Sequence, residues 1–177
     1  MRRLLTLLAM LTLAACQTLP PRSEMLATAC AEQPCRAESR ITLHDASGRA
    51  HEFLLPAGPV FAGGVLSIAQ GETQHLSVRI DDQGDAVLRW LSAEEKEAPY
   101  IGFRLDQVET EAGHASRLRI RNRTDHDLWL EAEQFPVNQD RFYPLTLSPI
   151  TAGQQAIRTW PHTILEVQLT GLRVLKN

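Results

Sequence analysis

The stretch that decides the fold is QHLSVRIDDQGDAVLRWL, residues 74–91, in which two alternating segments flank a short turn. Apolar and polar side chains alternate on both sides of the turn, which is typical of half-buried strands. Opposing Leu76 to Trp90 and Val78 to Leu88 keeps apolar residues opposite apolar residues. This pairing leaves the three-residue turn 82–84, in which Gly84 can take the left-handed position. The stretch therefore predicts an antiparallel hairpin with one buried face.

The same alternation recurs along most of the chain. The predicted strands cover residues 39–45, 51–56, 63–69, 74–81, 85–91, 100–108, 115–123, 127–134, 155–160 and 164–174. Short strands separated by turn residues at this spacing favour a sandwich or barrel, and no amphipathic helix of useful length competes with them. We therefore predict an all-β protein: a single antiparallel β-sandwich over residues 30–177, immunoglobulin-like in its architecture.

Two more hairpins can be placed in register by the same rule. In the first, Leu43 is predicted to oppose Phe53 and Ile41 to oppose Leu55, which leaves the loop 46–50. Residues 115–134 suggest another hairpin, which turns at Thr124-Asp125-His126 and opposes Ile120 to Leu130 and Asn122 to Leu128.

An arginine stripe runs along one face of the strand 115–123, and it resembles a phosphate-binding ribbon. The predicted hairpin nevertheless pairs it with the neighbouring strand: Arg117 with Glu133, Arg119 with Glu131, Arg121 with Trp129 and Arg123 with Asp127. Opposite charges across strands stabilise a sheet, and an arginine over an indole adds a cation–π contact. We therefore expect a solvated, self-paired face in preference to an anion site.

The N-terminus has the pattern of a secretory signal. Two arginines precede the apolar run 4–13, which is too short to cross a bilayer as a helix. The following residues, Leu13-Ala14-Ala15-Cys16, resemble the lipobox of bacterial lipoproteins, although an ordinary signal peptide that happens to precede a cysteine would look similar.

The resemblance implies that residues 1–15 are cleaved and that Cys16 carries a diacylglycerol, with palmitate among the acyl chains. Gln17 follows, where an Asp would indicate inner-membrane retention, so the resemblance implies the periplasmic face of an outer membrane. Residues 16–29 are then a short lipidated tether, and Pro20-Pro21 favours an extended start.

The other two cysteines, Cys30 and Cys35, form an even pair. In an oxidising periplasm we expect a disulfide between them. The alternatives are two free thiols or half of a metal site, but a zinc site needs further ligands nearby.

No cofactor, metal site or catalytic role is predicted. The six histidines (His44, His51, His75, His114, His126 and His162) have no metal-ligand spacing. The sequence has no nucleophile elbow, zincin helix or Gly-rich phosphate loop. A formal net charge of −3 gives no long-range attraction to nucleic acid. We expect the membrane to be contacted through the lipid, and other envelope proteins are possible partners.

The long loop 135–144 and the Trp160-Pro161-His162 break are the two unusual segments. Aromatics on a loop favour recognition when they are exposed, but large aromatics more often close a core. If a partner surface exists, we expect it at Phe142, Tyr143, Trp160 and His162. The first hypothesis is a noncatalytic binding or assembly module of the envelope. The second is a metal- or small-ligand-binding protein, or an enzyme whose site forms only in the fold.

Overall fold

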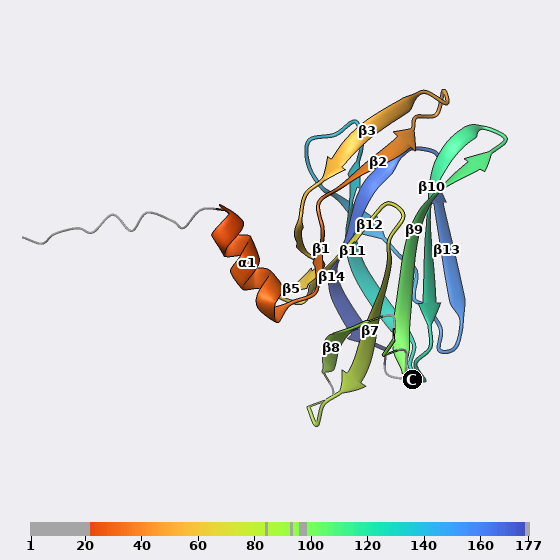
Figure 1. Cartoon of the computed structure of the whole chain (residues 1–177). Coiled ribbons are helices and arrows are strands. Elements are labelled where there is room, and N and C mark those ends of the chain that lie inside the picture. Colours follow the sequence, from red (N-terminus) through yellow and green to blue (C-terminus); the bar gives the residue numbers. More distant parts are fainter. Residues whose placement is uncertain (1–21, 84, 93, 96–98, 176–177) are drawn as a thin grey trace, which may run out of the picture.

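The structure is a computed structural model that describes residues 22–175 except 84, 93 and 96–98, and it contains two packed five-stranded antiparallel sheets (Figure 1). The first sheet has the order β13-β10-β9-β7-β8, with bounds Gln155–Trp160, Gly113–Asn122, Tyr100–Thr110, Thr73–Ile80 and Ala86–Leu91. The second has the order β12-β11-β14-β6-β5, with bounds Tyr143–Thr146, Leu128–Pro136, Ile164–Val174, Val65–Ala69 and Phe61–Ala62. The predicted all-β antiparallel sandwich is confirmed, whereas the finer likeness to immunoglobulin domains stays a prediction.

Smaller elements surround the sandwich. Strands β2 (Ser39–His44) and β3 (Ala50–Leu55) form a separate hairpin at one end, near the turn that joins β9 and β10 (Figure 1). The two-residue strands β1 (Cys35–Arg36) and β4 (Gly58–Pro59) pair with each other. Helix α1 (Arg22–Glu32) lies against β4.

The core lies between the inward faces of the two sheets. Alternation places Leu76, Phe103 and Leu118 on one side, and Leu66 and Val167 on the other, all at most 1% exposed. Burial of each such side chain contributes about 1.5–3 kcal/mol, so this alternation is the main reason why the strands form two layers.

All ten predicted strands are confirmed. Each of the ten predicted segments coincides with an observed strand to within two residues at either end. The register of the hairpin β7–β8 is also confirmed, with Leu76 opposite Trp90 and Val78 opposite Leu88. Gly84, at its turn, lies outside the described residues. The sequence pattern missed the short strands β1, β4, β5 and β12.

The predicted hairpin over 115–134 is wrong, because β10 and β11 belong to different sheets. The fully buried Asn122 explains the crossing between the sheets. Its Oδ1 accepts from Thr124 N and Oγ1, and its Nδ2 donates to His126 O at 2.8 Å and Ile150 O at 3.0 Å. These bonds satisfy the polar groups of the turn inside the protein and hold a corner between the layers.

The predicted register of the first hairpin is wrong by two residues. Ile41 opposes Phe53, Leu43 opposes His51, and the loop is 45–49. The cause is Asp45, whose Oδ1 accepts from Ser47 N at 2.9 Å and Arg49 N at 3.0 Å. An aspartate that caps its own turn in this way starts the loop one residue earlier than apolar matching suggests.

The predicted tether is helical where the structure describes it. Residues 24–29 are mostly good helix formers, but helix α1 has no strong apolar face that a 3.6-residue period would reveal. The expected signal peptide, Cys16 and the first part of the tether lie outside the described residues. Among the described helices, none has the length and apolar content to cross a membrane.

Candidate functional site: a cleft beneath the β2–β3 hairpin

A cleft of about 510 Å³ opens between the β2–β3 hairpin and the end of the sandwich. Three segments that are distant in sequence line it: the hairpin, the loop after β11 and the turn between β13 and β14. Its lining residues are Leu43, His44, Asp45, Ala46, Arg49, His51, Phe53, Val137, Asn138, Pro161, His162 and Thr163. Val137 N donates to Thr163 O at 3.1 Å, which joins the two sandwich segments. Clefts of this size suit small organic ligands.

The hairpin wall is fixed by hydrogen bonds around His44. Its backbone N donates to Gln107 Oε1 at 2.9 Å. Its carbonyl accepts from Gln107 Nε2 and from Thr163 Oγ1, both at 2.7 Å. The His44 ring also stacks on His114 with centroids 4.6 Å apart. The cleft therefore has a preformed wall, even though β2 and β3 belong to neither large sheet.

The tip of the hairpin contacts the β9–β10 turn at Gly113. The φ of Gly113 is +105°, and a Cβ built there would lie 2.4 Å from Ala46 O. The backbones of the two turns are therefore in contact at residue 113, where only glycine fits.

Asp45 organises the polar rim of the cleft. In addition to the backbone bonds of the loop, its carboxylate accepts from the Ser47 hydroxyl, and Oδ2 lies 2.9 Å from His51 Nε2. The hydrogen bonds from Ser47, followed by that from His51, hold the pKa of Asp45 well below its ordinary value. Asp45 therefore stays ionised at neutral pH, and the Arg49 guanidinium, whose Nε lies 3.3 Å from Oδ2, balances its charge.

The cleft is otherwise mainly apolar, with Leu43, Phe53, Val137 and Pro161 in its walls. Among the described residues, His162 Nε2 is buried and has no hydrogen-bond partner. A buried polar atom without a partner costs free energy in the folded state. The geometry suits a small ligand with an apolar body and one hydrogen-bonding group.

Of the four residues expected at a partner surface, only His162 lines the cleft. Phe142 packs near Phe135 at 5.2 Å between centroids, and the Tyr143 hydroxyl donates to Gln139 Oε1 at 2.6 Å. Trp160 is half-buried and packs against the sandwich core. Of the four, His162 alone therefore belongs to the cleft, and the partner surface stays a prediction.

The cleft histidines do not converge. Across the described part of the chain, no group of three or more His, Cys, Asp or Glu side chains is placed to hold a metal ion.

The predicted pairing of the arginine stripe is also wrong. Three of its members face outward from the first sheet and lie opposite β9: Arg117 opposite Asp106, Arg119 opposite Arg104 and Arg121 opposite Gly102. Arg123 follows the end of β10. Glu131 instead forms an ion pair with Arg173 of β14, in the other sheet.

Asp106 is the carboxylate that these arginines share. It is 9% exposed, and its oxygens accept from Arg104 Nε at 2.6 Å and from Arg119 Nη2, while Arg117 Nη2 lies 3.8 Å away. Burial by itself would raise the pKa of Asp106, but the hydrogen bonds and charges of Arg104 and Arg119 outweigh burial and lower it.

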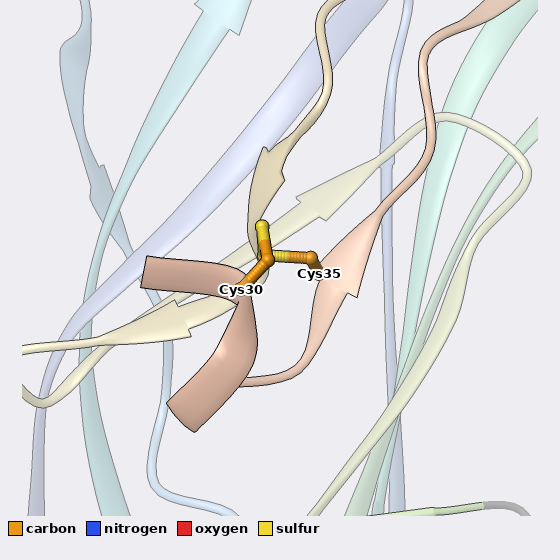
Figure 2. The surroundings of a disulfide bond; sticks show 2 residues. All are labelled: Cys30 and Cys35. Atoms are coloured by element: carbon orange, nitrogen blue, oxygen red, sulfur yellow. A yellow bond between two sulfur atoms is a disulfide. The ribbon is translucent and has the colours of Figure 1, made fainter. Parts of the chain in front are cut away.

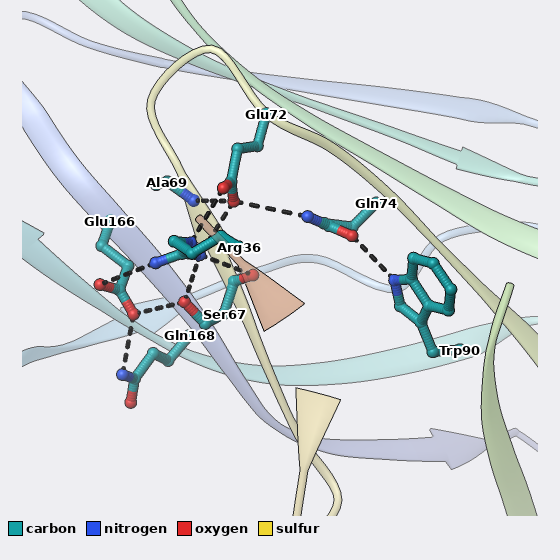
Figure 3. Close-up of polar contacts among 8 residues, drawn as sticks. All are labelled: Arg36, Ser67, Ala69, Glu72, Gln74, Trp90, Glu166 and Gln168. Carbon is teal, nitrogen blue, oxygen red and sulfur yellow. Dashed lines mark hydrogen bonds and ion pairs between the residues drawn. The ribbon is translucent and has the colours of Figure 1, made fainter. Parts of the chain in front are cut away.

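The predicted disulfide is confirmed: Cys30, near the end of α1, is bonded to Cys35 of β1 (Figure 2). Next to it, Arg36 lies among side chains of β6, of β14 and of the turn between β6 and β7 (Figure 3). Its guanidinium donates to both oxygens of Glu72 at 2.9 Å and to Ser67 Oγ at 2.7 Å, and lies 3.8 Å from Glu166. These contacts attach the N-terminal segment to the sandwich.

Comparisons with protein-family models, curated proteins and solved structures found no match to this chain.

Proposed function

We propose that the protein is a lipid-anchored lipoprotein of the cell envelope whose noncatalytic β-sandwich binds a small, mainly apolar ligand in the cleft beneath the β2–β3 hairpin. The anchor is inferred from the likeness of residues 13–16 to a lipobox, with Cys16 lipidated and the domain on the periplasmic face of an outer membrane. The disulfide Cys30–Cys35 supports an oxidising compartment.

The observation that carries the binding proposal is the mainly apolar cleft of about 510 Å³, whose hairpin wall is held by the hydrogen bonds around His44. The surrounding walls remove water from a ligand's apolar body, and the polar residues of the cleft, Asp45, Arg49 and Asn138 among them, supply hydrogen-bonding groups. A preformed wall reduces the conformational entropy that a ligand must remove on binding.

The ligand site can be tested with N-phenyl-1-naphthylamine, a neutral apolar fluorophore, titrated into the purified full chain. Phe53→Ser removes one apolar wall, and the neighbouring Leu54→Ser is the matched control because Leu54 is 57% exposed on the other side of β3. Loss of about 60 Å² of apolar contact predicts roughly tenfold weaker binding for Phe53→Ser.

Leu54→Ser should bind the fluorophore as the wild type does. Val137→Ser tests the same cleft from another segment and does not depend on the hairpin. Equal binding by the wild type, Phe53→Ser and Val137→Ser would contradict the cleft as the site.

The anchor is tested separately by expressing the full chain and its Cys16→Ser variant. The wild type should partition with membranes and carry the mass of a diacylglycerol, and Cys16→Ser should lose that mass. An unmodified Cys16 in the wild type would refute lipidation without bearing on the cleft.

A further inference from the structure

The outer face of the first sheet carries a concentration of positive charge that its own residues do not neutralise. Arg104, Arg117 and Arg119 all lie within 4 Å of the single carboxylate of Asp106. Arg121, the next outward residue of β10, is exposed and has no hydrogen bond or ion pair with any described residue. One negative charge therefore stands among four positive charges.

The register makes this arrangement costly for folding. Arg119 lies directly opposite Arg104 in the β9–β10 ladder. Like charges at opposed positions destabilise a sheet, and Asp106 offsets only part of their repulsion. Departures of this kind from local preference are expected at functional sites.

A groove of about 290 Å³ runs beside these arginines. Arg104, Arg119 and Arg121 line it together with the side chains of Thr73, Tyr100 and Gln155, which carry hydrogen-bonding groups. Gly102 forms part of its floor, and a Cβ there would lie 3.2 Å from the His75 ring. Gly102 lies directly opposite Arg121, and the absence of a side chain there lets the His75 ring pack close to the backbone.

We propose that this groove binds a phosphate group, with Arg121 as its principal ligand. Arg104 already donates to Asp106 and Thr73, and Arg119 donates to Asp106, so the role of these two arginines is mainly electrostatic. A guanidinium binds phosphate oxygens in a two-bond geometry, and a dianion matches the surplus charge better than a carboxylate does. This site is independent of the cleft, which lies beneath the β2–β3 hairpin.

The site can be tested by calorimetric titration of the purified full chain in detergent at low salt. One arm uses glycerol 3-phosphate, and the other uses dihexanoyl phosphatidic acid, with dihexanoyl phosphatidylcholine as its phosphodiester control. Similar binding of the two monoesters indicates a free phosphate ligand, whereas preference for the phosphatidic acid indicates a lipid headgroup. Both results support the site.

Arg121→Gln should weaken binding of the phosphate monoesters about tenfold or more, because it removes charged hydrogen bonds. Arg79→Gln is the matched control: Arg79 is an exposed arginine of the same sheet outside the groove. Its loss should change binding less than twofold. Since Arg121 has no partner among the described residues, both variants should keep the melting temperature.

Three results would overturn the proposal. These are no binding of either monoester, equal weakening by Arg121→Gln and Arg79→Gln, or tighter binding of acetate than of glycerol 3-phosphate.

Discussion

Replacing Arg36 with methionine should strongly destabilise the protein. The change leaves the carboxylates of Glu72 and Glu166 without their cation while their side chains remain only 21% and 20% exposed. Removing one member of a buried ion pair costs about 3–5 kcal/mol. This cost is a large fraction of the free energy of unfolding of a typical domain, which is about 5–15 kcal/mol. We therefore expect a fall in Tm of about 10 °C.

A second variant separates the cost of the unpaired carboxylates from the cost of the lost packing of Arg36. In the triple variant Arg36→Met, Glu72→Gln, Glu166→Gln, no uncompensated charge remains. The amide oxygens of the two glutamines can still accept the hydrogen bonds that Ala69 N donates to residue 72 and that Ser67 Oγ donates to residue 166. The triple variant should therefore recover to within about 1–2 kcal/mol of the wild type.

Urea unfolding followed by circular dichroism measures both variants. The exposed pair Arg89–Glu95 supplies the control, because Arg89→Met should cost less than about 1 kcal/mol. The reasoning is refuted if Arg36→Met costs no more than Arg89→Met, or if the triple variant is as unstable as the single one.

Three other changes test separate parts of the fold. Because the folded pKa of Asp106 is lowered, its ionised form stabilises the fold above its ordinary value of 3.8, and that contribution disappears as pH falls through the lowered value. Asp106→Asn should therefore cost about 2 kcal/mol at neutral pH and flatten the dependence of Tm on pH below 4, whereas an unchanged curve would contradict the role of this carboxylate. Replacing Cys30 and Cys35 with alanine should cost about 2 kcal/mol in thermal melts, since the loop is short, and a cost above about 4 kcal/mol would show that the bond does more than close it. Asn122→Ala should cost about 2 kcal/mol in urea unfolding, because it leaves the buried Thr124 N without its partner and removes one of the two hydrogen bonds at the His126 and Ile150 carbonyls, and a cost below 1 kcal/mol would argue against the corner.

The sequence predicts which residues face the core better than it predicts which strands are neighbours. Leu76 and Trp90 match across a short turn, so apolar matching finds their true pairing. Ile120 and Leu130 are also both buried, but they lie in different sheets. Alternation has the same period in both cases, and the difference lies in the side-chain bonds of Asn122, which hold a corner where a hairpin turn was expected.

The candidate sites are harder to predict for the same reason. Alternation along the strand predicts that the arginines point outward. Their pairing with Asp106 depends on which strand lies next to them in the sheet, and alternation does not predict that. The cleft is built from three distant segments, and its apolar lining has the same sequence pattern as a core. His162 stood out only because it follows the Trp160-Pro161 break, and the loop aromatics Phe142 and Tyr143 lie elsewhere.

The contact between Gly113 and Ala46 O has a consequence for how substitutions can change the cleft. Residue 113 lines none of the cleft, yet any side chain there would clash with Ala46 O, and Ala46 lines the cleft. Position 113 therefore influences the shape of the cleft from outside it. One substitution at this remote point would displace the tip of the hairpin and leave the chemistry of the lining residues intact.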